Sequence, residues 1–259
     1  MIKAIFFDID GTLFSHNTHS IPTSCDQALK KLKEKGILIF IATGRHKSEL
    51  INIPLEQYHF DGYITLNGQY CFNEDKVIYE KPVDQKDLIT ILNEIDYSPF
   101  PCYMIGKDKM YINYLTDNVI EIQNSIASII PEVIDLKSLI GQSVYQIGPF
   151  EMTKEQELRL LSKLDNCQST RWHDLAIDIL HKVGGKQNGI KAILEEYNIS
   201  IEETMAFGDG NNDKEMFEFV NISVAMGNAK EELKKCATYI TNDIDHDGIY
   251  NALKHFKII

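Results

Sequence analysis

The stretch "IKAIFFDIDGTLF", residues 2–14, decides the fold. Its first half, residues 2–7, is apolar and rich in strand-forming side chains, as expected of a buried strand. Asp8 and Asp10 come directly after it. An ionised carboxylate resists burial unless a cation or several hydrogen bonds compensate for the lost hydration. The stretch therefore predicts a buried strand that ends in two carboxylates with a compensating partner.

The length and composition limit the kinds of protein to consider. The chain has 259 residues, so we expect a main domain with a smaller inserted one. Hydrophobic residues make up 44%, and no apolar run approaches the roughly 18 residues of a membrane span. The N-terminus has the pattern of a strand and not of a signal peptide, and the five scattered cysteines fit reduced thiols. We expect a cytoplasmic protein with no membrane partner.

The charge pattern argues against a nucleic-acid partner. The formal net charge is −12, from 26 basic and 38 acidic residues, and only three of the basic residues are arginines. A nucleic-acid-binding protein needs a basic surface, and an anionic ligand of this chain must therefore meet local positive charge. The sequence also shows no heptad repeat, so we expect a monomer.

Strand and helix patterns alternate at both ends of the chain. Continuous apolar runs without period-two alternation indicate strands buried on both faces, as in a parallel sheet covered by helices. Thr23 or Ser24 is expected to cap the first helix, and Gly36 to end it. The pattern predicts a doubly wound, Rossmann-like α/β domain. After the first strand, strands are expected within residues 37–44, 60–68, 204–210, 222–227 and 238–241, and helices within 23–36, 188–200, 212–220 and 229–237.

The middle of the chain has longer, partly alternating strands. A hairpin is expected to turn near residues 106–109, and an antiparallel sheet with helices on one side should follow from the pattern. We expect an α+β domain at 82–183, inserted into a core formed by 1–81 and 184–259. The expected strands lie within 101–115, 143–150 and 175–180, and the helices within 84–95, 118–130 and 154–164.

Polar residues follow the buried strands of the predicted core. In open α/β sheets, ligands bind beyond the carboxyl ends of the strands, so these residues should converge. They are Asp8 and Asp10 after the first strand, Thr43, Gly44 and Arg45 after the second, Asn67 after the third, and Asp209, Asn212 and Asp213 after a later one.

Four of the converging residues are carboxylates, and this crowding predicts a bound cation. Four like charges cannot all stay ionised in a dry cleft, and oxygen ligands suit a hard ion such as Mg²⁺. With a cation present, a carboxylate can attack phosphorus while a lysine neutralises the phosphoryl group. Lys186, in "VGGKQNGI" at residues 183–190, is the candidate lysine.

Four motifs, in this order along the chain, resemble those of a known family. "DIDGT" at 8–12, "IATGR" at 41–45, the lysine of "GGKQNG" at 184–189 and "GDGNND" at 208–213 are similar to the motifs of the haloacid dehalogenase superfamily of phosphatases. The insert between the second and third motifs, and "NG" after the third strand, most resemble the Cof-type subgroup with a large α/β cap. The resemblance implies a phosphatase for small phosphorylated metabolites, either sugar phosphates or phosphorylated cofactors. It also implies that the 82–183 cap chooses the substrate.

The resemblance assigns roles to residues by position. It makes Asp8 the nucleophile that forms an aspartyl-phosphate, and Asp10 the acid and base. Asp8, the carbonyl of Asp10 and Asp209 would hold Mg²⁺, with Asp213 close by. It assigns phosphate or substrate binding to Thr43, Gly44, Arg45, Asn67, Lys186 and Asn212. For Arg45, a structural ion pair is an equal alternative.

Two departures and three competing functions stay open. Gln69 stands where the family commonly has a small residue, and "QNG" follows Lys186 where a glycine is expected directly. A phosphomutase or phosphotransferase would use the same aspartyl-phosphate, and a phosphometabolite sensor would keep the fold without catalysis. A dehalogenase is disfavoured because it needs neither Asp10 nor Mg²⁺. In the insert, Tyr103 and other hairpin tyrosines are expected to pack the sheet, with a substrate contact as the alternative.

Overall fold

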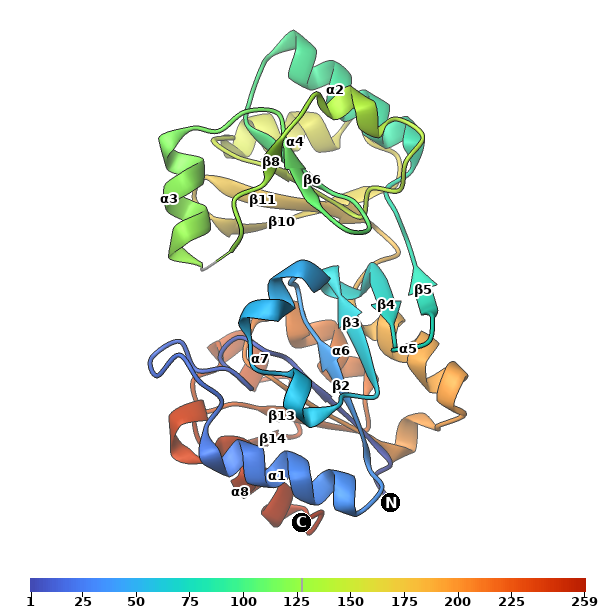
Figure 1. The fold of residues 1–259 in the computed structure, drawn as a ribbon, viewed down its shortest axis with the longest axis vertical. Helices are drawn as coiled ribbons and strands as arrows, with labels where there is room; N and C mark the ends of the chain where they lie inside the picture. Colours follow the sequence, from blue (N-terminus) through green and yellow to red (C-terminus); the bar gives the residue numbers. More distant parts are fainter. Residues whose placement is uncertain (127) are drawn as a thin grey trace. The chain divides into compact units, whose positions relative to one another are not determined.

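Figure 1 shows the fold in a computed structural model that describes residues 1–126 and 128–259. The chain forms two compact units. The first comprises Met1–Arg45, Leu50–Glu80 and Gly185–Ile259, and the second comprises His46–Glu49 and Lys81–Gly184. The second unit therefore interrupts the first, which is built from both ends of the chain.

An eight-stranded sheet forms the middle layer of the first unit, in the order β14-β13-β12-β1-β2-β3-β4-β5. The strands from β14 to β3 pair in parallel, and β4 and β5 add an antiparallel edge. This confirms the predicted α/β class with a parallel sheet; the antiparallel edge was not predicted. The strands are β1 (Ala4–Phe7), β2 (Leu38–Ala42), β3 (Gly62–Thr65), β4 (Tyr70–Phe72), β5 (Val77–Glu80), β12 (Thr204–Gly208), β13 (Ile222–Ala225) and β14 (Tyr239–Ile240).

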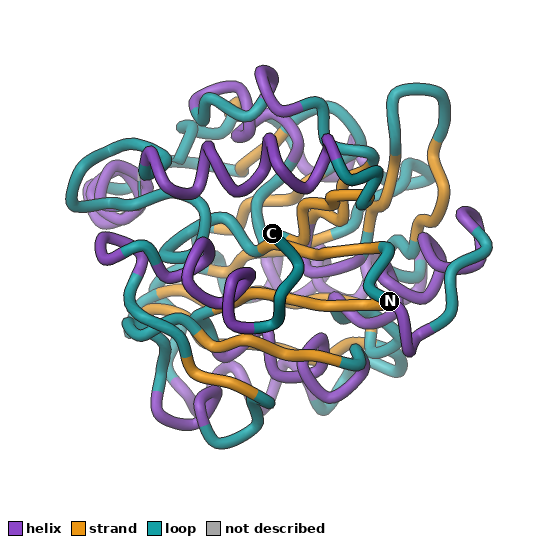
Figure 2. The backbone as a smooth tube through the Cα atoms, turned by 90° about the horizontal axis from the view of Figure 1, so that it is seen from below, coloured by secondary structure: helices purple, strands orange, loops and turns teal. Residues whose placement is uncertain are grey.

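Helices pack on both faces of this sheet because its strands are apolar on both. Successive strand residues point to opposite faces, so Phe6 and Phe7 enter different cores. Leu29 of α1 and Leu253 of α8 share the core of Phe7, whereas α5, α6 and α7 share that of Phe6. Figure 2 shows strands lying between helices in this way. The helices are α1 (Thr23–Glu34), α5 (Lys186–Tyr197), α6 (Lys214–Phe219), α7 (Glu231–Lys234) and α8 (Gly248–His255).

The second unit has a six-stranded sheet in the order β10-β11-β9-β6-β7-β8. Its pairs are antiparallel except for β7 with β8. Apolar residues of α2 and α4 share one core with Met104, Ile147 and Ile179, which fixes the face that these helices cover. The elements are α2 (Gln85–Tyr97), β6 (Cys102–Ile105), β7 (Met110–Ile112), α3 (Asp117–Ser125), β8 (Glu132–Val133), β9 (Gln146–Pro149), α4 (Lys154–Leu161), β10 (Cys167–His173) and β11 (Ala176–His181).

Local details correct some expectations from the sequence. Neither Thr23 nor Ser24 caps α1: Pro22 occupies the N-cap position, and no side chain makes a capping hydrogen bond there. Gly36 follows the helix with a φ of +70°, as the predicted C-terminal glycine should. The helix expected over 118–130 is shorter, because α3 ends at Ser125, and residue 127 of that range lies outside the described residues. The β10 strand and α8 were not predicted.

Short 3₁₀ helices connect several elements. They lie at Lys47–Asn52, Glu56–Tyr58, Leu66–Gly68, Leu136–Leu139, Ile201–Glu203, Asn211–Asp213 and Ile244–His246. Across the part of the chain that the structure describes, no helix combines the length and apolar character required to cross a bilayer. All five cysteines are free thiols.

Candidate active site

Asp8 is placed at the carboxyl end of β1, in the middle of the parallel sheet. Its backbone N–H donates to the carbonyl of Phe207 in β12 at 3.0 Å, so the ladder of the sheet holds it in position. The residue is 6% exposed. Burial therefore demands a compensating partner for the carboxylate, as the sequence predicted.

That partner is Lys186, the first residue of α5. Its Nζ donates to Asp8 Oδ1 at 2.7 Å and to Asp213 Oδ1 at 2.5 Å, and the lysine is fully buried. Asp213 Oδ2 in turn accepts hydrogen bonds from the backbone N–H groups of Asp209 and Gly210, both at 3.0 Å. One lysine thus links carboxylates that follow β1 and β12.

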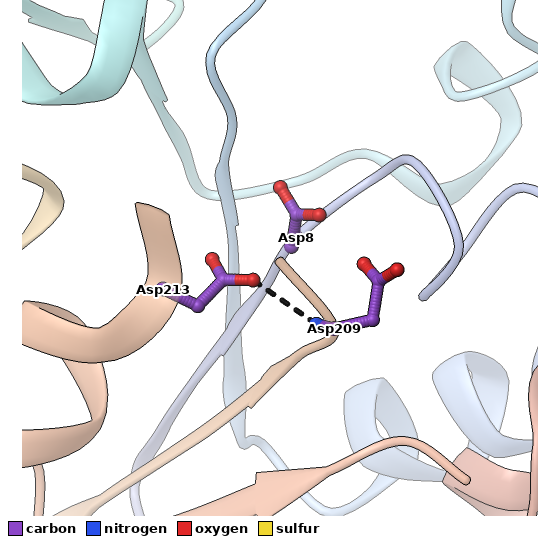
Figure 3. A group of neighbouring side chains, drawn as sticks. All are labelled: Asp8, Asp209 and Asp213. Carbon is purple, nitrogen blue, oxygen red and sulfur yellow. Dashed lines mark hydrogen bonds between the residues drawn. The ribbon is translucent and has the colours of Figure 1, made fainter. Parts of the chain in front are cut away.

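Asp8, Asp209 and Asp213 form a compact acidic cluster (Figure 3). One oxygen from each carboxylate lies within 4.8 Å of the others. Burial raises the pKa of Asp8 well above its ordinary value, and the charges of Asp213 and Asp209 add to the shift while Lys186 opposes it. Burial and the Asp213 charge raise the pKa of Asp209 to about 7. The charge of Asp213 therefore makes both Asp8 and Asp209 harder to ionise.

The same surroundings favour the charged form of Lys186, whereas they disfavour the charged form of Asp8. Burial by itself lowers the pKa of its ammonium group, but the carboxylates of Asp213 and Asp8 outweigh this effect and raise the pKa overall. The lysine is therefore charged at neutral pH. It supplies one positive charge against three carboxylates, which leaves the acidic cluster short of positive charge.

The donor set of the acidic cluster fits a hard divalent cation. Carboxylate oxygens are preferred ligands of Mg²⁺, and a dication would offset both the burial and the mutual repulsion that raise the pKa values of Asp8 and Asp209. Asp213 already uses both oxygens, one for Lys186 and one for two backbone N–H groups. Asp8 and Asp209 are therefore the better direct ligands, and Asp213 fits as a carboxylate that holds Lys186 and the 209–210 backbone.

Asp10 forms a separate ion pair with Arg45. The guanidinium donates from Nε to Asp10 Oδ2 and from Nη2 to Oδ1, both at 2.7 Å. His16 Nε2 lies 2.9 Å from Oδ1. The structure thus shows the ion-pair alternative for Arg45, and its expected substrate contact stays a prediction.

The remaining predicted residues surround the same strand ends. Thr43 is 1% exposed, and its Oγ1 accepts a hydrogen bond from Arg45 N at 3.1 Å. Asn67 Oδ1 accepts from Asn212 Nδ2 at 2.9 Å. A Cβ on Gly44 would lie 3.2 Å from the Asn67 side chain, so a larger residue would press on that amide. Residues from three strand ends are thus brought together.

Tight backbone geometry connects the loop after β3 to the start of α5. Asn67 has a left-handed backbone (φ 51°), and its carbonyl accepts a hydrogen bond from Gly185 N at 2.9 Å. A Cβ on Gly68, with φ +87°, would lie 2.1 Å from the Gly185 carbonyl oxygen. Only glycine fits at position 68, and the close approach fixes the base of the helix that carries Lys186.

The sequence reasoning missed three neighbours of Asp209 and Asp10. Thr12 Oγ1 donates to Asp209 Oδ1 at 3.3 Å, and Asn228 Nδ2 donates to the Gly11 carbonyl at 2.8 Å. Thr12 belongs to a quoted motif, and Asn228 follows β13, so the strand-end rule could have found both. His16 had no comparable signal.

Comparisons with known proteins agree with this arrangement. A family model for haloacid dehalogenase-like hydrolases matches residues 5–253. A Bacillus subtilis protein named "Putative phosphatase YkrA" is 34% identical over 99% of this chain and 98% of its own length. The structure of the HAD subclass IIB sugar phosphatase BT4131 is 39% identical with a TM-score of 0.87, covering 99% of this chain and all of that one. The phosphatase BT1666 from Bacteroides thetaiotaomicron is 33% identical with a TM-score of 0.91, covering 100% and 96%.

Proposed function

The chain belongs to the haloacid dehalogenase-like hydrolases and is a phosphoric monoester hydrolase, and we propose that it uses Mg²⁺ and an aspartyl-phosphate to hydrolyse small phosphorylated metabolites. Sugar phosphates and phosphorylated cofactors are the proposed substrates. One observation carries the proposal: Lys186 bridges Asp8 and Asp213 beside Asp209, at the carboxyl ends of two adjacent parallel strands.

Asp8 is the proposed nucleophile. Its carboxylate attacks phosphorus, the new bond forms between an Asp8 oxygen and phosphorus, and the ester oxygen of the substrate leaves. Lys186 fixes one Asp8 oxygen at 2.7 Å and provides positive charge where the phosphoryl group gathers negative charge. Thr43, Gly44 and Asn212 are the proposed ligands of the phosphoryl oxygens, and Asn67 orients Asn212.

Asp10 is the proposed acid and base. It would protonate the leaving oxygen and then take a proton from the water that attacks the aspartyl-phosphate. Arg45 donates a hydrogen bond to each oxygen of the Asp10 carboxylate, and these two contacts orient the group. To act as an acid, Asp10 must carry a proton, and one of its two Arg45 hydrogen bonds must then be given up.

Asp8, Asp209 and the backbone carbonyl of Asp10 are the proposed Mg²⁺ ligands, with Asp213 behind them. A bound Mg²⁺ would supply charge that stabilises the phosphoryl group during transfer. The chain's own contribution is the acidic cluster, which Thr12 and the 209–210 backbone N–H groups orient.

The second unit is proposed to be the cap that selects substrates, with residues 82–183 as its extent and 1–81 with 184–259 as the catalytic core. We also propose a monomer that works in the cytoplasm. Five free thiols fit a reducing compartment. Size-exclusion chromatography with light scattering checks the monomer.

Phosphate release from a broad panel of phosphorylated metabolites tests the proposal. The assay is run with Mg²⁺, with EDTA, and with Mg²⁺ restored after EDTA. We expect release that needs Mg²⁺ and is concentrated on one class of phosphomonoester. Asp75→Asn, which changes an exposed carboxylate far along the chain from the motifs, is the matched control and should keep full activity.

Two outcomes would replace the proposal. Transfer of phosphate to an added sugar hydroxyl in preference to water would identify a phosphotransferase or phosphomutase. Tight binding of a phosphometabolite without release or transfer, by folded protein with Mg²⁺ present, would identify a sensor.

A further inference from the structure

We infer that Asn228 is a positioning residue for the metal site, and that it favours Mg²⁺ over larger dications by holding the Asp209 carboxylate against the loop after β1. The inference deepens the proposed function and rests on it, because the ion concerned is the Mg²⁺ proposed above. Asn228, Asp209 and that loop all belong to the first unit.

The side-chain amide of Asn228 joins two strand-end loops. Its Nδ2 donates to the Gly11 carbonyl at 2.8 Å, and the same nitrogen donates to Asp209 Oδ2 over a longer distance of 3.5 Å. Gly11 follows β1, Asp209 follows β12 and Asn228 follows β13, so the ends of three neighbouring strands meet at this amide. Gly11 is next to Asp10, whose backbone carbonyl is a proposed Mg²⁺ ligand. The amide therefore contacts one proposed ligand and the residue beside another.

The orientation of the Asn228 amide is fixed by its two ends. The backbone N–H of Ile244 donates to Asn228 Oδ1 at 3.0 Å, so the oxygen faces Ile244 and the nitrogen must face Gly11. A carbonyl can only accept a hydrogen bond and a backbone N–H can only donate one, and an amide satisfies both at once. Asn228 is thus held with its donor aimed at the Gly11 carbonyl and at Asp209.

The backbone on either side of Asn228 is also held. Two residues after it, Lys230 N–H donates to the Asp209 carbonyl at 3.0 Å. One residue before it, Gly227 N–H donates to the Asn242 carbonyl at 2.9 Å. The turn that carries Asn228 is therefore tied both to the backbone of Asp209 and to the loop after β14, and its amide reaches the Asp209 carboxylate from a fixed base.

The Asp209 carboxylate lies directly against the loop after β1. Gly11 has a φ of +75°, and a Cβ there would lie 2.3 Å from Asp209 Oδ2. Thr12 Oγ1 donates to the other oxygen, Oδ1, at 3.3 Å. A hydroxyl thus holds one oxygen of Asp209 and an amide holds the other. Both donors are neutral, so they restrain the position of the carboxylate without cancelling its charge.

This restraint bears on which ion the site prefers. Mg²⁺ requires near-ideal octahedral geometry with short ligand distances, whereas Ca²⁺ accepts longer distances and a flexible geometry. Oxygens that hold fixed positions favour the ion with the stricter requirement, and residues that orient metal ligands typically contribute about 10- to 100-fold to metal affinity. Loosening of Asp209 and of the 10–11 backbone should therefore weaken Mg²⁺ binding more than Ca²⁺ binding.

Thermal unfolding of the full-length chain tests the inference without any substrate. The melting temperature is followed as MgCl₂ or CaCl₂ is added at pH 8, and its rise gives the affinity for each ion. Asn228→Ala should weaken Mg²⁺ binding about tenfold and Ca²⁺ binding less than about threefold. Asn228→Ser, whose shorter side chain cannot join both loops, should act in the same direction and provides a second variant if Asn228→Ala folds poorly.

Asn221→Ala is the matched control. Asn221 is also exposed, stands at the other end of β13, and donates from Nδ2 to the Glu202 carbonyl at 2.8 Å. Each alanine variant loses an amide-to-carbonyl hydrogen bond of the same length, so the two metal-free melting temperatures should agree within a few degrees. Asn221→Ala should bind both ions as the wild type does. A lower metal-free melting temperature for Asn228→Ala with unchanged ion affinities would show a merely structural role and overturn the inference.

The inference and the proposed function fail in different ways. Wild-type affinities for both ions in Asn228→Ala, or equal losses for Mg²⁺ and Ca²⁺, would refute the role of Asn228 and leave the phosphatase intact. A chain that binds Mg²⁺ with the expected dependence on Asn228 but releases no phosphate from any phosphomonoester would refute the proposed function and leave the inference.

Discussion

The acidic cluster of the first unit and the surroundings of Asp178 in the second unit both hold a carboxylate largely away from water, but they stabilise it differently. In the first, Lys186 provides a full positive charge to Asp8 and Asp213. In the second, Asp178 receives hydrogen bonds from a phenol and an indole, which are neutral donors. The first arrangement suits a reaction that moves charge, and the second orients a carboxylate through neutral donors. The following experiments test this contrast, from the largest expected effect to the smallest.

Asp8→Asn should abolish catalysis without unfolding the protein. An amide cannot act as the nucleophile, so we expect kcat to fall by about 10³-fold or more. Asn fills nearly the same volume, and Lys186 keeps its contact with Asp213, so the melting temperature should move by only a few degrees. Phosphate release and thermal unfolding measure the two quantities. Turnover above one hundredth of the wild-type rate would exclude Asp8 as the nucleophile.

Lys186→Met should be the most destabilising of these changes. It removes the buried cation that Asp8 and Asp213 share and leaves their negative charge uncompensated, which costs about 3–5 kcal/mol of unfolding free energy. Lys191→Met, on the exposed side of the same helix, is the control and should stay within about 0.5 kcal/mol. Urea unfolding at pH 7 compares them. Equal stability of the two variants would show that Lys186 is not balancing the acidic cluster.

Mg²⁺ should stabilise the protein, and more so at high pH. Because burial and Asp213 raise the pKa of Asp209 to about 7, the metal-free protein holds a proton there between about pH 4 and 7 that the unfolded chain has lost. Stability without metal should therefore fall as pH rises through this window. Mg²⁺ competes with that proton, so its effect should approach about 2.7 kcal/mol at a hundredfold excess over Kd at pH 8 and shrink by pH 5.5.

Thermal unfolding at both pH values, with and without Mg²⁺, measures this effect. Ca²⁺ at equal concentration controls for ionic strength and for a general preference for dications. A Mg²⁺ effect as large at pH 5.5 as at pH 8 would contradict a site made of the Asp8 and Asp209 carboxylates.

The smallest effect should come from Asp178→Asn and should be independent of Mg²⁺. Burial raises the pKa of Asp178 to about 6, so the folded protein keeps this proton between about pH 4 and 6 and loses stability as pH rises through that window. Glu49, whose charge adds to the shift, remains in the variant. The stability of Asp178→Asn relative to wild type should therefore improve from pH 4 to 6.5. An unchanged difference across this range, measured beside Asp174→Asn as the control at an exposed carboxylate, would refute the shift.

Residues at the ends of strands could be predicted from sequence, whereas residues on the faces of strands could not. A buried apolar run followed by a carboxylate shows where Asp8 and Asp209 must lie, because the carboxyl ends of parallel strands share one edge. The partners of a mid-strand residue depend on register, and a shift by one residue reverses the face. Tyr103 faces Gly148 only because β6 and β9 pair in one register.

The partner of the Arg45 ion pair was also beyond sequence reasoning, although an ion pair was one of the two expected roles of Arg45. Arg45 and Asp10 were both singled out, yet the two hydrogen bonds between them depend on how the loops after β1 and β2 turn. His16 joins them from a loop with no periodic pattern. Lys186, in contrast, was placed by its order among four motifs, which needs no knowledge of loop geometry.

The discontinuity of the first unit has a consequence for how the protein is made. Ala4 of β1 pairs with Thr204 of β12, so two neighbouring strands inside the larger sheet are about two hundred residues apart in the chain. A ribosome must release nearly the whole chain before β12 can pair with β1, while residues 81–184 are already available to fold. Until then β1 has an open edge and apolar faces, and such strands aggregate readily. The nascent chain is therefore expected to depend on chaperones in the interval between its first strand and its twelfth.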